Sequence, residues 1–430
     1  MVDHNSRTGA RLDRARLTRE QFSALRRMLE PVLATNAFYR DKLAAAGVSR
    51  PEDIASLEDL RRLPFTTRRE LTEDQAAHPP HGSLLTFPLE RYTRLHRTSG
   101  TTGLPLRWLD TAESWQWLVD SWACGYDAAG VGAEDGVFLA FSFGPFIGLW
   151  CAFEAARRVG AMAMPGGGLS TEQRARLMAD NRATVLVSTP TYALHLADVA
   201  RANGIPAMDS VRVTIHGGEP GASVPATKRR IADAWGATCF DHAGATEVGS
   251  WGFECAELSG LHINESEFIA EVLDTASGEP AAEGELVLTN LGRVGMPLIR
   301  YRTGDHVRLA SDPCTCGRTY VRLDGGVTGR VDDAMVIRGT VVFPAALENA
   351  IRSVPQVTEY AVDVDRRGTL DELRVRIERA EDGGGAPAAV AESIRRATGL
   401  RAEVTACAVG VLPRYELKSR RVRDHRNTPI

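Results

Sequence analysis

Short apolar runs alternate with helical patterns between Leu95 and Ala237, and this alternation constrains the fold more than any other feature of the sequence. Strands are predicted at Val137–Phe143, Thr184–Ser188 and Val211–His216, and helices at Leu149–Val159, Ala193–Arg201 and Ser223–Trp235. Strands separated by helices pair in parallel because each helix returns the chain across the sheet. The sequence therefore predicts an α/β region with a substantially parallel sheet.

Different patterns flank this region. A long helical region is predicted from Thr18 to Gly47, with Asn36 and Phe38 as candidate breaks, and a new helix begins near Arg68 with Thr66 or Thr67 as its N-cap. Antiparallel strands are predicted at Phe268–Leu273 and Gly284–Asn290. A compact βαββαβ-like unit follows Gly329, with strands near Val357–Asp365, Glu372–Arg379 and Ala402–Ala408.

The bulk properties favour a soluble, multidomain enzyme. The chain has 430 residues, more than one hydrophobic core usually organises, so two or three domains are expected. A net charge of −4 without a long internal basic run argues against nucleic acid as a partner. The N-terminus lacks the apolar core of a secretory signal, and the most apolar stretch, Val137–Phe153, contains Gly144 and Pro145, so no membrane span is expected. Seven scattered cysteines argue against a disulfide framework, and a cytoplasmic location is expected.

The most informative segment for chemistry is the hexapeptide Thr98, Ser99, Gly100, Thr101, Thr102 and Gly103. Glycines let a backbone approach an anion closely, and hydroxyl and N–H groups can surround phosphate oxygens. The hexapeptide lacks the Gly-Lys-Ser/Thr ending of a Walker loop and the GxGxxG spacing of a dinucleotide site. Taken alone, it is either a polar turn or a phosphate loop of another kind.

Five further motifs follow the hexapeptide in order. They are His216-Gly217-Gly218-Glu219-Pro220, Ala243-Gly244-Ala245-Thr246-Glu247, Tyr301-Arg302-Thr303-Gly304-Asp305, Gly329-Arg330-Val331-Asp332-Asp333 and Pro413-Arg414-Tyr415-Glu416-Leu417-Lys418. Each motif alone is typical of an ordinary polar or charged turn. Together and in this order, the six segments resemble the motifs of the adenylate-forming superfamily, which holds acyl-CoA synthetases, luciferases and nonribosomal-peptide adenylation domains.

The resemblance implies roles for the charged residues of these motifs. Thr246 would contact the α-phosphate of ATP, and Glu247 would hold Mg²⁺, which neutralises charge as pyrophosphate leaves. Asp305 would accept the two ribose hydroxyls, which suit the two oxygens of a carboxylate. Arg330 would contact the nucleotide, and Lys418 would bridge the substrate carboxylate and the α-phosphate. The remaining nucleotide contacts would come from the hexapeptide and from Gly217, Gly218, Glu219, Pro220, Ala243 and Gly244.

Two positions depart from the superfamily pattern. Leu104 stands where a lysine usually follows the last glycine of the phosphate loop, and Arg107 is a candidate substitute for its pyrophosphate contacts. Ala243 stands where an aromatic residue usually stacks on adenine. Stacking on adenine must therefore come from another residue or be weaker.

The resemblance also implies the fold class and the domain organisation. An α/β fold is expected, with a large N-terminal adenylate-forming domain of several subdomains and mixed sheets over residues 1–329, which binds ATP and the acid. A small, mobile α+β domain over residues 330–430 would carry Lys418. After adenylation this domain would rotate about Asp332, withdraw Lys418 and open a path for the thiol.

Within the superfamily, the sequence is most similar to the phenylacetate–CoA ligase branch. The similarity lies in the segments Leu63–Thr67 and Ser188–Tyr192 and in the short chain. That branch mostly activates aryl acids, so a small aromatic acid, ATP with Mg²⁺, and coenzyme A are the implied substrates. Candidate residues of the acid pocket are Phe141, Phe143, Phe146, Trp150, Tyr192 and Gly244. Aromatic side chains supply the flat apolar walls that an aryl ring needs, although any single one is more often a core residue.

Four residues have the chemistry of a closed zinc site: Cys255, His262, Cys314 and Cys316. Three thiolates and one imidazole leave no open position, which is typical of structural rather than catalytic zinc. Spacing alone leaves zinc and four reduced side chains equally open. Relatives of the phenylacetate–CoA ligase branch that carry a similar constellation favour zinc. The other cysteines lie in apolar contexts and are expected to be inert.

Several functional alternatives remain open at this stage. The acceptor thiol could belong to coenzyme A or to the phosphopantetheine arm of an acyl or peptidyl carrier protein. The nucleotide chemistry could serve nitrite activation towards an aromatic amine, as in an ATP-dependent diazotase. A catalytically inactive nucleotide-binding module is disfavoured because Glu247, Asp305, Arg330 and Lys418 are all retained. A monomer or a homodimer is expected.

Overall fold

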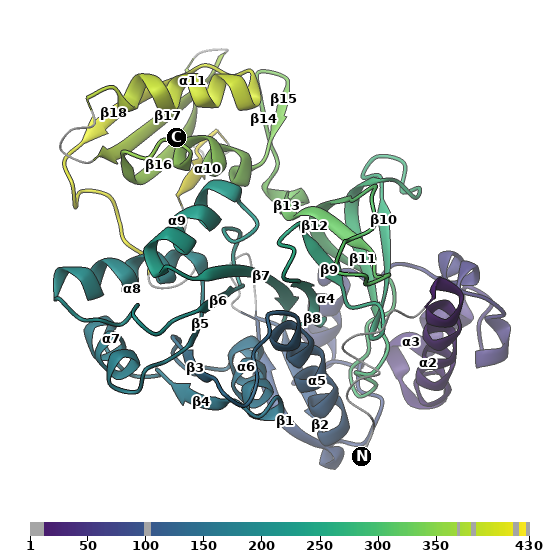
Figure 1. Cartoon of the computed structure of the whole chain (residues 1–430). Helices are drawn as coiled ribbons and strands as arrows, with labels where there is room; N and C mark the ends of the chain where they lie inside the picture. Colours follow the sequence, from purple (N-terminus) through teal and green to yellow (C-terminus); the bar gives the residue numbers. More distant parts are fainter. Residues whose placement is uncertain (1–12, 99–104, 368–369, 380–383, 416–420, 427–430) are drawn as a thin grey trace.

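The structure is a computed structural model that describes residues 13–98, 105–367, 370–379, 384–415 and 421–426 (Figure 1). Its central feature is an 11-stranded sheet in the order β10-β11-β12-β13-β9-β8-β7-β6-β5-β3-β4. The strands are β3 (Gly136–Leu139), β4 (Met162–Pro165), β5 (Val185–Ser188), β6 (Val213–His216), β7 (Thr238–Ala245), β8 (Gly249–Glu254), β9 (Leu261–Ile263), β10 (Phe268–Leu273), β11 (Glu283–Asn290), β12 (Tyr301–Leu309) and β13 (Arg322–Arg330).

The half of the sheet from β7 to β4 is parallel. The helices between its strands are α6 (Ile147–Arg158), α7 (Thr171–Asp180), α8 (Pro190–Ala202) and α9 (Pro225–Trp235). β3, β5 and β6 are buried along their whole length, as expected for parallel strands covered by helices. The predicted parallel α/β region is therefore confirmed. The strand predicted at Val137–Phe143 ends earlier, at Leu139, because the Gly144-Pro145 turn precedes α6.

The other half of the sheet is antiparallel, and the hairpin predicted at β10 and β11 is present. Thr66 forms a one-residue parallel bridge with Tyr301 at the start of β12. The Thr66 N–H donates to the Arg300 carbonyl at 3.0 Å, and the Thr66 carbonyl accepts from the Arg302 N–H at 2.9 Å. The segment before α4 is thus fixed to the strand that carries the Tyr301–Asp305 motif.

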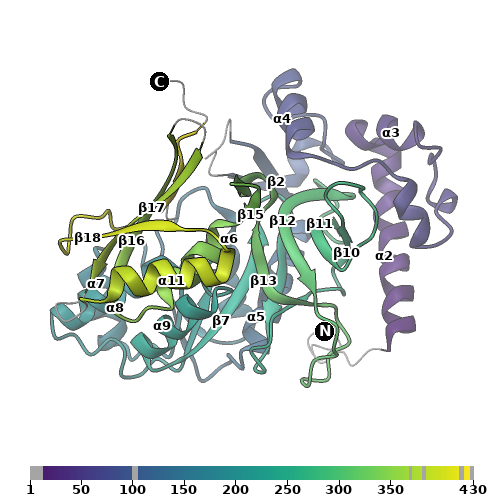
Figure 2. The ribbon, with the colours of Figure 1, turned by 90° about the horizontal axis from the view of Figure 1, so that it is seen from above.

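The N-terminal helices lie at the opposite end of the molecule from the C-terminal strands (Figure 2). The predicted long helical region is broken at Asn36, whose side chain accepts from the Tyr39 N–H at 3.0 Å and donates to the Leu84 carbonyl at 2.7 Å. The elements before β3 are α2 (Arg14–Thr35), α3 (Ala37–Ala44), η1 (Pro51–Asp53), η2 (Glu58–Arg62), α4 (Arg68–Ala77), η3 (Leu89–Arg91), β1 (Tyr92–Arg97), β2 (Arg107–Thr111) and α5 (Ala112–Ala128). No helix among the described residues is long and apolar enough to cross a membrane.

The chain after β13 forms a separate α+β unit, the C-terminal unit, with its own apolar core. Its elements are η4 (Val331–Asp333), β14 (Met335–Ile337), β15 (Thr340–Val342), α10 (Pro344–Arg352), β16 (Val357–Arg367), β17 (Leu370–Arg379), α11 (Ala386–Thr398), β18 (Ala402–Cys407) and β19 (Val422–Asp424). The main sheet of the unit has the order β18-β17-β16-β19. The strands β16 to β18 match the predicted ones, whereas β19 has no counterpart among them because it contributes only three residues.

The C-terminal unit packs on α9 of the large sheet (Figure 1). Arg230 of α9 donates to the carbonyls of Arg352, Val354 and Val357 at 3.1, 2.7 and 2.5 Å. These carbonyls lie at and just beyond the C-terminus of α10, where a helix leaves its acceptors unsatisfied and favours a cation. One arginine therefore caps a helix of the neighbouring unit.

The cap of α4 provides a first prediction. The Thr67 hydroxyl accepts from the Glu70 N–H at 3.2 Å, and the Glu70 carboxylate accepts from the Thr67 N–H at 2.8 Å. Replacing Thr67 by alanine should lower the free energy of unfolding by about 1 kcal/mol, measured by urea unfolding. Thr72 of the same helix, whose hydroxyl only donates back to the Arg68 carbonyl, is the matched control, and its alanine variant should change stability by at most about 0.5 kcal/mol. Equal losses in both variants would contradict the capping role.

Candidate active site

The predicted adenine-side loop follows β6 at the carboxyl edge of the parallel strands, where ligands of open α/β sheets bind. A Cβ on Gly217 would lie 2.7 Å from the His242 carbonyl oxygen, so only glycine fits between the two strand ends. The Glu219 carboxylate accepts from the Thr191 N–H at 2.9 Å, in the first turn of α8. The structure thus joins the loop after β6 to the helix after β5.

The Thr246–Glu247 segment forms the turn between β7 and β8, and a buried arginine holds it. Arg293 is fully buried and donates to the carbonyls of Thr246 and Glu247 at 2.6 and 3.0 Å. Its guanidinium also forms a bidentate pair with Asp110 of β2, with both distances 2.7 Å. The arginine therefore ties the turn between β7 and β8 to the strand that follows the phosphate-loop segment.

Glu247 is nearly buried and its carboxylate pairs with Arg68, the first residue of α4. The second terminal nitrogen of Arg68 donates to the Thr98 hydroxyl at 3.2 Å. Thr98 also accepts from the Leu106 N–H at 3.0 Å through the same oxygen. Arg68 thus connects the carboxylate predicted to hold Mg²⁺ with the start of the predicted phosphate loop. The other predicted loop residues, Ser99, Gly100, Thr101, Thr102 and Gly103, lie outside the described residues.

Asp305 and Arg330 form the ribose side of the predicted site. Arg330 donates to Asp305 at 3.1 Å, to the Thr303 carbonyl at 2.8 Å and to Asp332 at 3.1 Å. Burial raises the pKa of Asp305 to about 6, and Arg330 opposes the shift. A Cβ on Gly304, which has φ +74°, would lie 2.7 Å from an Arg330 nitrogen, so glycine is needed for this approach. The candidate hinge Asp332 is thereby hydrogen-bonded to Arg330, the arginine predicted to contact the nucleotide.

Lys418 lies outside the described residues, but the chain on its C-terminal side is anchored at the site. The buried Arg421 side chain pairs with Glu359 through two contacts of 2.6 and 3.0 Å. It also donates to the Thr191 hydroxyl at 3.2 Å. Because the Thr191 N–H binds Glu219, two hydrogen bonds link Arg421 to the loop after β6.

The candidate acid-pocket residues fall into three places. Phe143 contacts Trp150 edge to face, with ring centroids 4.8 Å apart, and the Trp150 indole donates to the Gly144 carbonyl at 3.0 Å. Phe141 is buried in the main core, and Phe146 is half-buried. Tyr192 instead lies 1% exposed in a second core cluster and donates to the Thr171 hydroxyl at 3.2 Å. The other candidate, Gly244, packs against the Gly249 carbonyl, and Ala243 beside it is half-buried.

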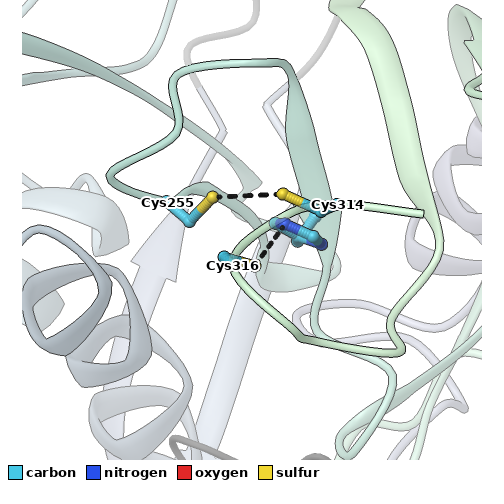
Figure 3. Close-up of side chains that lie close together, drawn as sticks. Cys255, Cys314 and Cys316 are labelled. Carbon is cyan, nitrogen blue, oxygen red and sulfur yellow. Dashed lines mark hydrogen bonds between the residues drawn. The ribbon is translucent and has the colours of Figure 1, made fainter. Parts of the chain in front are cut away.

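The four candidate metal ligands converge, and Figure 3 shows three of them, Cys255, Cys314 and Cys316. Their donor atoms all lie within 4.8 Å of one another. Cys255 Sγ lies 3.7 Å from Cys314 Sγ, and Cys316 Sγ lies 3.5 Å from His262 Nε2. A tetrahedral zinc ion with bonds of about 2.3 Å to sulfur and about 2.0 Å to nitrogen has edges of about 3.8 and about 3.5 Å. The donor set and these separations fit a closed zinc site.

Comparisons with known proteins identify the family. The family described as the AMP-binding enzyme C-terminal domain matches residues 339–426. The phenylacetate–coenzyme A ligase of Thermus thermophilus is 36% identical over 380 residues, which cover 86% of this chain and 83% of that enzyme. The chain belongs to the phenylacetate–coenzyme A ligase family. The phenylacetate–coenzyme A ligase of Escherichia coli is 34% identical over 410 residues, 90% of each chain. The family predicted from the motifs is thus confirmed.

Solved structures confirm the predicted fold and indicate its conformation. The crystal structure of 2-hydroxyisobutyryl-CoA ligase in the postadenylation state, in complex with R3-HIB-AMP, superposes with a TM-score of 0.91 at 29% identity, covering 97% of this chain and 91% of that one. In the thioesterification state, with 2-HIB-AMP and CoA, the same ligase gives a TM-score of 0.73 at 30% identity, covering 98% and 92%. The aligned share of the chains hardly changes between the two comparisons. The difference in TM-score therefore reflects how the parts of the chain are arranged relative to one another. In this phenylacetate–coenzyme A ligase family member, the arrangement is more similar to that of the first structure than to that of the second.

Apart from Arg330, the sequence alone does not point to the arginines that organise this site. Arg68 directly follows the predicted N-cap of a helix, and that position is the only available signal. Arg293 and Asp110 are separated by 183 residues and belong to no motif. Arg421 lies in a basic run that is typical of a solvated surface, although its side chain is buried against Glu359. The partners of these side chains are distant in sequence and come close only in the folded chain.

The Arg293–Asp110 pair gives a prediction about stability. Replacing Asp110 by asparagine leaves a buried guanidinium without its counter-charge, which should cost about 3–5 kcal/mol of unfolding free energy in denaturant titrations. The control is Asp324→Asn, which removes one partner of the exposed Arg308–Asp324 pair and should cost at most about 1 kcal/mol. If Asp110→Asn costs no more than Asp324→Asn, the buried pair does not anchor the site.

Proposed function

We propose that this protein uses ATP to activate an aryl carboxylic acid of the phenylacetate or benzoate type and transfers the acyl group to coenzyme A. A carboxylate oxygen of the acid attacks the α-phosphorus of ATP, the bond to the bridging oxygen breaks, and pyrophosphate leaves. The thiol sulfur of coenzyme A then attacks the acyl carbon of the acyl-AMP. AMP leaves and the thiol proton passes to solvent, so that the acyl-CoA thioester remains.

The observation that carries this proposal is the similarity to phenylacetate–coenzyme A ligases over 86 and 90% of the chain. The site geometry supports it because Glu247 and Asp305 are each paired with an arginine. Each guanidinium could bind a nucleotide phosphate, and each carboxylate could then bind a divalent cation or ribose hydroxyls. In this proposal Thr246 contacts the α-phosphate, Glu247 holds Mg²⁺ and Asp305 accepts the ribose hydroxyls. Lys418 stabilises the charge that develops during adenylation.

The domain boundary and hinge are part of the proposal. Residues 1–329 bind ATP and the acid, and residues 330–430 rotate about Asp332 between the two half-reactions. The match to two states of one ligase with different TM-scores supports such a rotation. The arrangement described here places Arg421 against Thr191, near the proposed nucleotide loop, as adenylation by Lys418 would require.

ATP–pyrophosphate exchange tests the proposed function directly. Benzoates, phenylacetates and cinnamates should be compared with 2-hydroxyisobutyrate, and nitrite should be assayed separately. Exchange driven by an aryl acid, followed by acyl-CoA formation when coenzyme A is added, would support the proposal. If only 2-hydroxyisobutyrate drives exchange, the substrate is a hydroxy acid and not an aryl acid. If only nitrite is active, or if no substrate is active, the ligase proposal is overturned. Exchange without acyl-CoA formation would favour a carrier-protein thiol as acceptor.

Two substitutions should affect the half-reactions in opposite ways. Asp332→Pro fixes a backbone dihedral at the proposed pivot, so thioester formation should fall more than adenylation. Arg230→Gln removes the cap on α10 that belongs to the present arrangement, so adenylation should fall about tenfold, with thioester formation from supplied acyl-AMP less affected. The two half-reactions can be followed by pyrophosphate exchange and by release of AMP on addition of coenzyme A. Equal loss of both in both variants would contradict the proposed rotation.

We further propose that Cys255, His262, Cys314 and Cys316 hold a structural zinc ion. The ligands come from the end of β8, from β9 and from the loop between β12 and β13. Zinc would therefore fasten this loop to the adjacent strands of the large sheet. No step of the reaction passes through the ion, because a complete protein ligand set leaves no position for substrate.

Metal analysis tests the zinc proposal. The purified protein should contain about one zinc per chain, and Cys314→Ser should lose most of it and unfold at a lower temperature. Cys407→Ser is the control, because Cys407 lies in β18, outside the group of four ligands, and donates to the Ile377 carbonyl. Zinc-free wild-type protein with unchanged thermal stability after exposure to zinc would contradict the proposal.

A further inference from the structure

We propose that Arg68 is a pyrophosphate-binding residue that holds Glu247 before ATP binds and pairs with the leaving pyrophosphate during adenylation. This inference rests on the proposed function, and it assigns the cationic role of the phosphate loop to a residue outside that loop. The loop itself has Leu104 where the superfamily usually has lysine. The reaction still needs a cation at that end, because pyrophosphate leaves with more charge than it carries within ATP.

The position of Arg68 supports this role. One terminal nitrogen pairs with Glu247, and the other donates to Thr98 at 3.2 Å. The guanidinium therefore lies between the proposed Mg²⁺ ligand and the first residue of the phosphate-loop hexapeptide. Its side chain is 34% exposed, against 9% for the Glu247 side chain, so the arginine rather than the carboxylate faces solvent. An anion that enters the site from solvent would contact the Arg68 guanidinium before the Glu247 carboxylate.

The charge balance of the site explains how Arg68 can change partners. A nearly buried carboxylate needs a counter-charge, and Arg68 supplies it to Glu247 in the structure. Glu247 would hold Mg²⁺ together with the nucleotide, and the ion would supply the counter-charge that Arg68 now provides, so the guanidinium could take another partner. A guanidinium has five N–H donors in a planar fork that matches phosphate oxygens, so Arg68 can bind pyrophosphate without leaving its place.

The backbone that carries Arg68 is fixed on both sides. Thr66, two residues earlier, is hydrogen-bonded to Arg300 and Arg302 beside the strand that carries Asp305. Glu70, two residues later, completes the capping box with Thr67 and pairs with Lys42 at 2.7 Å. Arg68 and Asp305 thus belong to one rigid frame. Little conformational entropy would be lost when the guanidinium binds an anion there.

The nearest competing candidate for the missing lysine is Arg107. Its side chain is exposed on β2, and its backbone N–H and carbonyl are both bound by the Gln75 side chain, at 2.9 and 2.7 Å. Among the described residues, no hydrogen bond or ion pair joins its guanidinium to Glu247 or Thr98, whereas Arg68 contacts both. The geometry therefore favours Arg68 over the substitute suggested by the sequence alone.

The test compares Arg68→Gln, Arg68→Lys and Arg69→Gln. Arg69 is the matched control because it is the next residue of α4, is 83% exposed and lies 4.0 Å from Glu73. Arg68→Gln should raise the KM for pyrophosphate in the exchange reaction by about 10- to 100-fold, the usual effect of losing a charged hydrogen bond. Thioester formation from supplied acyl-AMP and coenzyme A should stay within about twofold, because that half-reaction contains no pyrophosphate.

The remaining variants and controls separate binding from structural support. Arg68→Lys should recover part of the pyrophosphate affinity, since the charge is kept, and Arg69→Gln should match the wild type. Equal loss of both half-reactions in Arg68→Gln, or no change in the pyrophosphate KM, would overturn the proposal. Thermal unfolding of each variant checks that the fold is intact.

Calorimetric titration with Mg²⁺-pyrophosphate tests Arg68 independently of the acid substrate. Wild-type protein should bind pyrophosphate more tightly than Arg68→Gln, and equal binding would overturn the role of Arg68. If no acid supports exchange in the wild type, the proposed function fails, but this difference in pyrophosphate affinity is still measurable. The two failures are therefore distinguishable.

Discussion

The buried pair between Arg293 and Asp110 is the interaction on which the rest of the site depends. Neither side chain is exposed, and the arginine shares its donors between the Asp110 carboxylate and the carbonyls of Thr246 and Glu247. Trp108 covers the guanidinium at 5.0 Å from its ring centroid. A buried ion pair adds little net stability, because desolvation offsets the attraction. The pair instead fixes geometry: Arg293 binds both Asp110 carboxylate oxygens and two carbonyls of the turn that carries Glu247, and so it holds that turn in place.

The contacts between the C-terminal unit and the large sheet are of another kind. They are hydrogen bonds made by a few long side chains, chiefly Arg230 and Arg421, rather than an interlocked apolar core. The unit keeps its own apolar core, so it can separate from α9 without exposing that core. Such an interface can be broken and remade as a whole, which is what two discrete arrangements of one chain require. The higher TM-score against the postadenylation state is consistent with the intact set of these contacts.

The sequence predicted the elements better than the contacts between them. Parallel strands are recognisable as short apolar runs between helices, so β5 and β6 were located to within two residues. The zinc ligands could also be proposed, because thiols and imidazoles are rare and chemically specific. Arg68 could not be assigned from the sequence, because arginine is common at helix starts and its partner Glu247 lies 179 residues away. Long-range ion pairs leave no local pattern, and Arg68, Arg293 and Arg421 all form such pairs.

The replacement of the usual aromatic residue by Ala243 has a structural consequence for the adenine side. The neighbouring ring cannot take over, because His242 points to the opposite face of β7, where it stacks on Trp122 at 4.0 Å and hydrogen-bonds to Ser250 at 2.7 Å. Burial lowers the pKa of His242 to about 3, so this imidazole is neutral and belongs to the core. On the side of the proposed nucleotide site, β7 offers the methyl group of Ala243, and the loop after β6 adds the peptide planes of Gly217 and its neighbours. A base held there would be recognised by shape and backbone hydrogen bonds more than by stacking, and the ribose and phosphate anchors would then supply a larger share of the nucleotide affinity.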